Sequence, residues 1–158
     1  MKHLGKQSKQ PTSPNIKILD KVKNNNVGSN YVIRLIQPEF TCLCPITGQP
    51  DFAHIIIDYI PNKWIVESKS LKLFFNSYRD SRSFHENTTI EIVEAINKLL
   101  NPVWIRIGGY WYPRGGIPID IFWQNKIPPK KAWIPEQEVT PYRGSCLLYT
   151  SPSPRDPE

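Results

Sequence analysis

The chain of 158 residues is poor in cysteine and histidine, and it has no long apolar run. Its three cysteines and three histidines are too few and too scattered for a disulfide framework or a structural zinc site, so we expect reduced thiols and no metal ligands. No apolar stretch reaches the length of a membrane span, and the polar start MKHLGKQSKQ differs from a secretory signal. A cytoplasmic location, away from membranes, is the default expectation.

Glycine-rich phosphate-binding motifs are also absent. The sequence has neither G-x-G-x-x-G nor a P-loop, so any dinucleotide would bind without a Rossmann unit. The chain is nevertheless basic, with a formal net charge of +6 at pH 7. That charge favours anionic partners, such as a phosphorylated cofactor or substrate, or nucleic acid. Because the basic residues are mostly dispersed, no nucleic-acid stripe is evident, and we expect no direct nucleic-acid partner.

Composition divides the chain into three parts. Residues 1–30 are polar and contain two prolines and three successive asparagines, so we predict a mostly irregular arm. Residues 31–144 carry the apolar periodicity of one domain. Residues 145–158 form a Ser/Pro-rich tail, and its segment CLLYTSPSPRD resembles the translation of a sequencing-library adapter. A natural disordered tail is the alternative, and both interpretations predict an unstructured segment.

Four strands and two helices are expected in the domain. Alternating β-branched and apolar residues indicate strands at 31–36, 54–60, 103–112 and 117–123. Apolar residues at helical spacing indicate helices at 68–79 and 88–100. Ser68 could cap the first helix, and Thr88 or Thr89 the second. Residues 63–66 either extend the strand pairing or lead into the first helix.

The element order ββααββ predicts an α+β fold. Such a chain forms an antiparallel sheet with two helices on one face. A single layer of four strands has two exposed edges, and exposed edges invite pairing with another subunit. We therefore expect a homo-oligomer on physical grounds alone.

A short loop holds the most reactive combination of side chains. Residues 39–51 place Cys44 and Asp51 on a loop stiffened by Pro45 and Pro50. A thiol becomes a nucleophile when its neighbours stabilise the thiolate, and a carboxyl group in a closed site can donate a proton. A small buried hydrophobe and an ordinary turn residue are the alternatives for Cys44 and Asp51. The loop alone leaves both interpretations open.

Two further segments offer ligand contacts. Glu86, beside His85, could accept two hydrogen bonds from the N–H and NH₂ edge of a guanine-like base, or could simply favour a helix N-terminus. His85 by itself is more typical of a structural histidine. Lys69 and Lys72 share a helix face that could hold a phosphate, as could the N-terminus of that helix. A solvated charged face is the alternative.

Four segments together resemble the NADPH-dependent 7-cyano-7-deazaguanine reductases, specifically their short single-module type. They are LCPITGQPDFA, VESKSLKLFFNSYR, FHE and PRGGIPIDIFWQ, which begin at residues 43, 66, 84 and 113. The resemblance extends from about residue 5 to residue 144. It implies the tunnelling fold, whose ββααββ units join their sheets into a multi-subunit barrel. Pentamers or decamers, with active sites between subunits, are expected from it.

The resemblance also implies a reaction. The family reduces the nitrile of 7-cyano-7-deazaguanine to a primary amine, with two NADPH, in queuosine biosynthesis. Carried onto this sequence, Cys44 is the nucleophile that forms a thioimide with the nitrile carbon, and Asp51 is the proton donor. The expected contacts of the deazaguanine are Val66, Glu67, Ser68, His85 and Glu86. The expected contacts of NADPH are Lys69, Ser70, Lys72 and Arg79.

Two alternatives from other classes remain. A purine- or pterin-ring hydrolase of the same superfamily, like GTP cyclohydrolase I, needs a zinc site of Cys and His, and His3, His54 and His85 form no clear metal pair. A basic nucleic-acid-binding module predicts salt-dependent RNA binding that is indifferent to Cys44→Ala. A metal assay and an RNA-binding assay separate these alternatives from the reductase.

Overall fold

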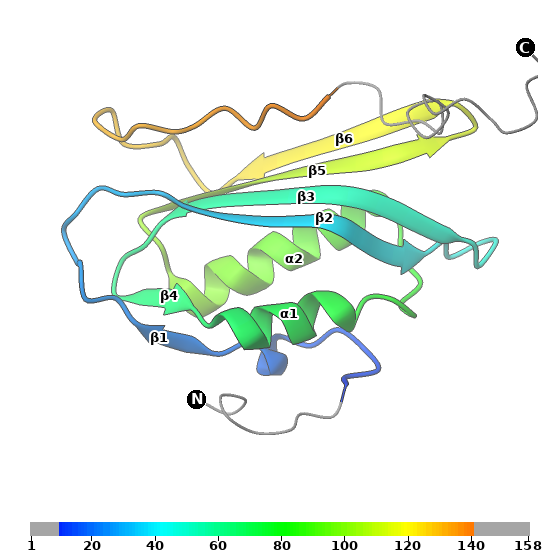
Figure 1. Ribbon diagram of the computed structural model, residues 1–158, viewed down its shortest axis with the longest axis horizontal. Helices are drawn as coiled ribbons and strands as arrows, with labels where there is room; N and C mark the ends of the chain where they lie inside the picture. The colour runs from blue at the N-terminus through cyan, green and yellow to red at the C-terminus, as the bar shows by residue number, and fades with distance from the viewer. Residues whose placement is uncertain (1–9, 141–158) are drawn as a thin grey trace, which may run out of the picture.

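A computed structural model describes residues 10–140 of the chain. Figure 1 shows a four-stranded sheet with two helices against one face and the C-terminal segment along the other. The sheet is antiparallel in the order β2-β3-β5-β6. Its strands are β2 (Ile33–Leu43), β3 (Pro50–Ile60), β5 (Trp104–Arg114) and β6 (Ile117–Gln124), and the helices are α1 (Ser68–Asn76) and α2 (His85–Leu100). The predicted antiparallel sheet with two helices is confirmed, whereas the suspected adapter lies outside the described residues.

β3 is a central strand that is buried on both faces. Ala53, Ile55 and Ile57 belong to the core shared with the helices. Alternate residues of a strand point to opposite faces, so Ile56 and Asp58 face the other side, and they too are buried. This double burial explains the nearly continuous apolar run of this segment.

α2 lies closely against the sheet. Ile92, Val93, Ile96 and Leu100 are fully buried along its inner face, and burying each such side chain contributes roughly 1.5–3 kcal/mol. A Cβ atom at Gly109 on β5 would lie 2.7 Å from the Thr89 hydroxyl oxygen of α2. Only glycine therefore permits this helix–strand approach.

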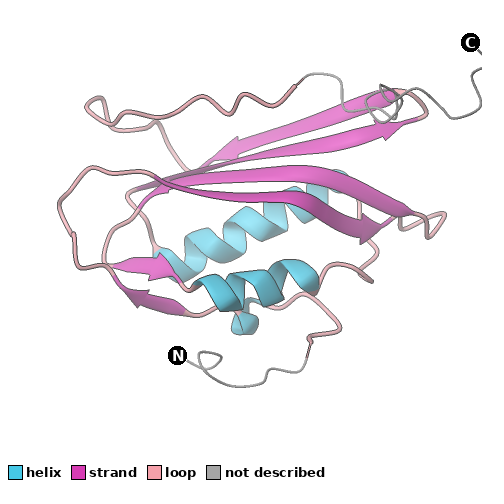
Figure 2. Cartoon of the chain, in the orientation of Figure 1, coloured by secondary structure: helices cyan, strands magenta, loops and turns pink. Residues whose placement is uncertain are grey.

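A second, two-stranded ribbon connects the N-terminal arm to α1. β1 (Lys21–Lys23) pairs antiparallel with β4 (Trp64–Val66), and a 3₁₀ helix, Ile16–Ile18, precedes it. Figure 2 shows this ribbon apart from the main sheet. The segment at 63–66 therefore does not extend the main sheet but pairs with the arm. Beyond the ribbon, the Glu67 N–H donates to the Asp20 carbonyl oxygen at 2.9 Å, which fixes the start of α1.

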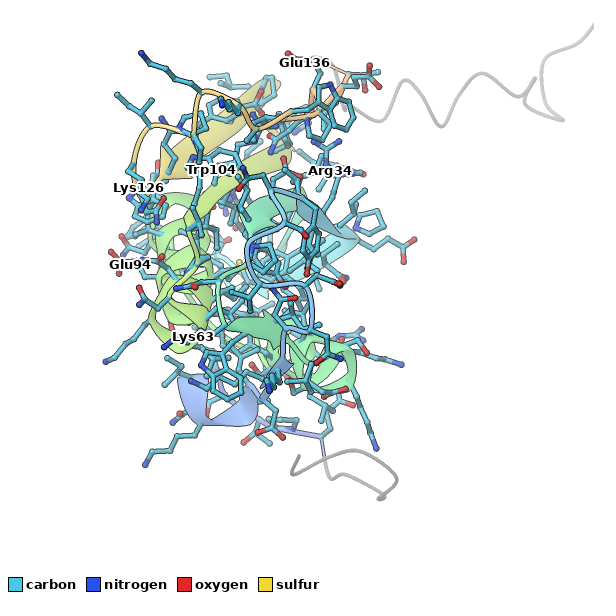
Figure 3. All side chains as sticks on the ribbon, turned by 90° about the vertical axis from the view of Figure 1, so that its left-hand side faces the viewer. Arg34, Lys63, Glu94, Trp104, Lys126 and Glu136 are labelled. Atoms are coloured by element: carbon cyan, nitrogen blue, oxygen red, sulfur yellow. The ribbon has the colours of Figure 1, made fainter. Side chains whose placement is uncertain are left out.

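The C-terminal segment (residues 125–140) is held to the outer sheet face through Asp58. This fully buried carboxylate accepts hydrogen bonds from Arg34 Nε at 2.6 Å and from Arg106 Nε at 2.9 Å. Both guanidinium groups also donate to the carbonyl oxygen of Pro135, and Arg34 donates to that of Glu136 at 2.8 Å. Figure 3 shows Arg34 beneath the segment that carries Glu136.

Both helices begin differently from the predicted caps. Glu67, not Ser68, caps α1, because its longer side chain reaches the N–H groups of Lys69 and Ser70, at 2.9 and 2.7 Å. α2 begins at His85, three residues before Thr88, and its N-cap Phe84 makes no side-chain capping bond. Thr88 and Thr89 are instead buried inside the first turns. None of the helices in residues 10–140 is long and apolar enough to cross a membrane.

Candidate active site

Three connections meet at one end of the fold: the β2–β3 loop, the α1–α2 connection and the β5–β6 turn. Figure 1 shows them together at the right-hand end. β2 continues to Leu43, so the loop with Cys44 is shorter than the predicted 39–51 and covers only residues 44–49. Its backbone closes on itself, because the Cys44 N–H donates to the Gln49 carbonyl oxygen at 2.8 Å and the Gly48 N–H donates to the Cys44 carbonyl oxygen at 3.0 Å. Gly48 has a φ of +70°, which suits glycine.

The loop is tied to the start of α2 by backbone hydrogen bonds. The Leu43 N–H donates to the Ser81 carbonyl oxygen at 2.9 Å, and the Ser83 N–H donates to the Leu43 carbonyl oxygen at 3.1 Å. Leu43 and Arg82 thereby form an isolated parallel bridge. These two backbone hydrogen bonds place Cys44 near the first turn of α2, which carries His85 and Glu86.

The two cysteines at the end of β2 have opposite environments. Both are free and buried. Hydrogen bonds from the Thr47 side chain and backbone, followed by the Ile46 backbone and the Arg114 side chain, lower the pKa of Cys44 from 9.0 to about 6, although burial opposes this. Burial in the core raises the pKa of Cys42 to about 11. The lowered pKa favours the thiolate of Cys44 at neutral pH, whereas the raised pKa of Cys42 keeps it a protonated thiol of the core.

Asp51 lies between two basic side chains. Its Oδ1 is 3.2 Å from Nη2 of Arg114, and its Oδ2 is 3.2 Å from Nε2 of His85. The His85 contact is misaligned for a hydrogen bond, so Oδ2 and Nε2 are both buried polar atoms without a hydrogen-bond partner in the described structure. Buried polar atoms are rarely left unsatisfied, and such a pair is typical of a site that a ligand completes.

His85 is held in a fixed plane by the core. Its ring stacks on Trp111 with centroids 4.1 Å apart and an interplanar angle of 8°. The Trp111 indole N–H donates to the Thr89 hydroxyl oxygen at 3.0 Å, and that hydroxyl donates to the His85 carbonyl oxygen at 2.8 Å. The imidazole that faces Asp51 is thus positioned by two neighbours on β5 and α2.

The residues predicted to bind NADPH fall into two groups. Lys72 and Arg79 are exposed and Lys69 is half-buried. Ser70 is fully buried: its hydroxyl donates to the Glu67 carbonyl oxygen at 2.7 Å and accepts from the Asp20 N–H at 2.9 Å. Ser70 therefore contributes to the fold at this position rather than to a ligand surface.

The start of α1 is not an available phosphate site. The Glu67 carboxylate already accepts from the Lys69 and Ser70 N–H groups that would otherwise bind an anion. Arg79 instead lines a surface cavity of about 410 Å³ at the edge of β2, together with Phe52 and Tyr112. Anion binding near α1 depends on its basic side chains.

The predicted substrate-binding residues are divided between the two ends of the molecule. His85 and Glu86 lie at the end that holds Cys44, and Glu86 is exposed there. Val66, Glu67 and Ser68 join β4 to α1 at the opposite end, as Figure 1 shows. α1 alone separates the ends by about 14 Å at 1.5 Å per residue. One chain does not bring the two groups together.

Arg114 and Trp111 belong to the site but were not predicted as site residues. Arg114 lies in PRGGIPIDIFWQ, one of the four segments that carry the family resemblance, and this was the available signal. Nothing in the sequence neighbourhood of Trp111 indicates that it stacks on His85. Within residues 10–140, no group of three or more His, Cys, Asp or Glu side chains is arranged to hold a metal ion.

Comparisons with known proteins identify the family. A family model described as QueF-like protein matches residues 50–130. A relative from Rhizobium etli, named NADPH-dependent 7-cyano-7-deazaguanine reductase, is 59% identical over 141 residues, which cover 89% of this chain and 91% of the relative. A relative of the same name from Zymomonas mobilis is 60% identical over 142 residues, covering 90% and 97%. This chain belongs to that reductase family.

A solved structure has a similar fold. The crystal structure of the archaeosine synthase QueF-Like in the apo form matches with a TM-score of 0.57 and covers 63% of this chain and 99% of that chain. Its sequence identity of 22% supports similarity of fold alone. Family membership confirms the resemblance drawn from the four sequence motifs, and it disfavours the ring-hydrolase alternative.

Proposed function

We propose that this protein reduces the nitrile of 7-cyano-7-deazaguanine to the amine of 7-aminomethyl-7-deazaguanine, with NADPH, in tRNA queuosine biosynthesis. The observation that carries the proposal is the Cys44 thiol, whose pKa is lowered and which shares the Arg114 guanidinium with the Asp51–His85 pair. The cluster lies in a chain about 60% identical to reductases of that name. A nitrile carbon is a poor hydride acceptor, and a thiolate beside an acid removes that obstacle.

The first step uses only residues of the protein. The Cys44 thiolate forms an S–C bond to the nitrile carbon, and one π pair of the C≡N bond moves to nitrogen. That nitrogen takes a proton from Asp51, which becomes a carboxylate, and a thioimide results. The C=N carbon of the thioimide accepts hydride more readily than the nitrile. The lowered pKa of Cys44 keeps the nucleophile ionised at neutral pH.

NADPH supplies hydride to this carbon when it is bound. The chain offers three basic side chains for its phosphates: Lys69 and Lys72 on α1, and Arg79 just beyond it. Two of them are exposed, and none depends on the occupied N-terminus of α1. These residues fit an anionic cofactor bound without a Rossmann unit.

The deazaguanine ring requires a carboxylate and a flat pocket. Glu86 is exposed beside the reacting cluster, so its two oxygens are free to meet the N–H and NH₂ edge of the ring. The carboxylate oxygens of Glu67 already accept backbone N–H groups, and each keeps a second lone pair for a ligand. We assign the ring edge mainly to Glu86, with His85, and place Val66, Glu67 and Ser68 at the pocket wall.

The pocket is proposed to form between copies of the chain. Val66, Glu67 and Ser68 lie at the opposite end from Cys44, so a neighbouring copy would supply them. The edge strands β2 and β6 of the four-stranded sheet provide surfaces for such assembly. We propose a pentamer or decamer whose sheets join into a barrel, with each site formed by two neighbouring copies.

Subunit complementation tests the shared site. Cys44→Ala removes the nucleophile, and Lys69→Glu alters the opposite end of the chain. We expect each variant alone to be inactive, and an unfolded and refolded mixture to regain activity because some sites combine two intact halves. A mixture as inactive as its components would contradict a site shared between subunits.

Substrate-dependent NADPH oxidation tests the function itself. Purified protein should oxidise NADPH only when 7-cyano-7-deazaguanine is present, with two NADPH consumed per amine formed. Guanine, which lacks the nitrile, is the matched control ligand and should give no oxidation. Absence of oxidation with the cyano compound would contradict the proposed function.

The need for a reduced thiol also supports our placement of the protein in the cytoplasm.

A further inference from the structure

Arg114 occupies a fixed position at the junction of the reacting groups. It is the last residue of β5, and it pairs with Ile117 across a two-residue turn. Gly115 and Gly116 in that turn have φ values of +58° and +83°, the conformation of a tight hairpin that only glycine adopts easily. The backbone of Arg114 is therefore held by the ladder on one side and by the turn on the other.

The strand register directs Arg114 toward Asp51. Ala53 pairs with Trp111, so the start of β3 lies beside the end of β5. Arg114 Nη2 reaches Asp51 Oδ1 at 3.2 Å, and the opposite oxygen, Oδ2, faces His85 Nε2 at 3.2 Å. The two oxygens of Asp51 thus have different neighbours: a guanidinium that is always charged, and an imidazole that can exchange a proton.

The same guanidinium lies close enough to the Cys44 sulfur to help lower the pKa of that thiol. Its side chain is 41% exposed, so an isolated ion pair with Asp51 would contribute little to stability. The value of this contact lies in its geometry, because a planar guanidinium has donors for two acceptors at once.

We propose that Arg114 is a positioning residue that holds the Cys44 thiolate and Oδ1 of Asp51 on one guanidinium, so that Oδ2 is the oxygen that carries the transferable proton. This inference rests on the proposed function, since it assigns a residue to the same nitrile addition. The S–C bond forms as the nitrile nitrogen takes the Oδ2 proton, and the resulting Asp51 carboxylate remains neutralised by Arg114.

The thiolate titration tests this role without substrate or cofactor. The ultraviolet absorbance of the thiolate is followed as the pH is changed, and the absorbance of the Cys44→Ala variant is subtracted. The difference gives the midpoint pH at which Cys44 alone ionises. Thr47, Ile46 and Arg114 act directly on this thiol. The other titratable or charged groups nearby are Asp51 and Cys42, which lie near the same Arg114 guanidinium, His85 beside Asp51, and the Arg82 guanidinium against Gly48 of the loop. We expect a midpoint of about 6 in the native protein and an upward shift of about one unit in Arg114→Gln.

Arg82→Gln is the matched control. It removes a guanidinium that packs against Gly48 of the same loop, whereas the ion pairs of Asp51 in the described structure are with His85 and Arg114. Its midpoint should stay at the native value. An unchanged midpoint in Arg114→Gln, or an equal shift in both variants, would overturn the proposal, because the effect would then be absent or a general effect of charge.

The Arg114→Lys variant separates the effect of the positive charge from the effect of the guanidinium geometry. It also replaces Arg114→Gln as the test if that variant fails to fold. An ammonium keeps the charge but lacks the planar fork, so the midpoint should move little while covalent adduct formation with the nitrile slows at least about tenfold. An adduct rate equal to the native rate would overturn the positioning role. If native protein forms no adduct at all, the proposed function fails, while the titration still reports on Arg114.

Discussion

Asp51 and Asp58 lie on the same strand, and each faces an arginine of β5, yet their environments differ. Asp58 is fully buried, and its two oxygens accept hydrogen bonds from both Arg34 and Arg106. Asp51 has one arginine at Oδ1, while Oδ2 lies near His85 without a hydrogen bond. A saturated buried carboxylate fixes structure, whereas an unsaturated one retains capacity for a ligand or a proton.

Glu67 extends the comparison to a third buried carboxylate. Both of its oxygens accept backbone N–H groups at the start of α1. Like Asp58, it is satisfied within the chain, although its partners are amides rather than arginines. Among the buried carboxylates of residues 10–140, Asp51 is the one whose oxygen lacks a hydrogen bond.

Asp51→Asn should produce the largest effect and separate chemistry from folding. An amide of the same shape cannot deliver the proton, so turnover should fall by about 10²–10⁴-fold, the usual contribution of a general acid. Steady-state NADPH oxidation measures the loss, and thermal unfolding should change little. Turnover within a few-fold of the native protein would remove Asp51 from the proton-donor role.

Asp58→Ala should show the opposite pattern. Two arginines lose their buried partner, so the free energy of unfolding should fall by about 3–5 kcal/mol, measured by urea denaturation. Activity per folded molecule should be largely retained. Glu94→Ala, on the exposed face of α2, is the matched control and should cost no more than about 0.5 kcal/mol. A small loss for Asp58→Ala would contradict its structural role.

The pH dependence of adduct formation distinguishes Cys44 from Cys42. The thiolate is the reacting form, and the pKa of Cys44 is lowered to about 6, so above pH 7 ionisation of Cys44 is nearly complete and raises the rate no further. Below pH 6 it should fall about tenfold per pH unit as the thiol becomes protonated. Stopped-flow measurement of adduct formation checks this. A rate that keeps rising toward pH 9 would indicate an ordinary, unassisted thiol.

Glu67→Ala should lower the free energy of unfolding less than Asp58→Ala does. Losing the N-cap of α1 should lower the free energy of unfolding by about 0.5–2 kcal/mol. Ser68→Ala is the matched control, because the Ser68 side chain is exposed and makes no capping bond. Thermal unfolding of both variants measures the difference. A larger loss for Ser68→Ala would restore Ser68 as the cap.

The sequence was most informative where function depends on local motifs. The segment around Cys44 and Asp51 and the FHE triplet before α2 point to the family without any tertiary information. The main strands and both helices were also predicted, because their apolar periodicity is strong. The boundaries of these elements depend on distant contacts, and the predicted boundaries were less accurate. For example, α2 begins at His85 instead of Thr88, directly after the hydrogen bond between Ser83 and Leu43.

Non-local contacts account for what was missed. β4 pairs with β1, which is some forty residues earlier in the chain, and the pattern at 63–66 does not specify that partner. The Asp58 cluster joins β2, β3, β5 and the C-terminal segment, and no motif connects them. Arg114 reaches Asp51 only through the β3–β5 register, so its place in the site follows from the fold.

The central claim is that Cys44 forms a covalent thioimide with the nitrile, and intact-mass spectrometry tests it most directly. Native protein mixed with 7-cyano-7-deazaguanine in the absence of NADPH should gain the full mass of the substrate, and peptide mapping should place it on Cys44. Cys42→Ala should form the same adduct, and Cys44→Ala should form none. An adduct that persists in Cys44→Ala, or no mass gain in the native protein, would contradict the account.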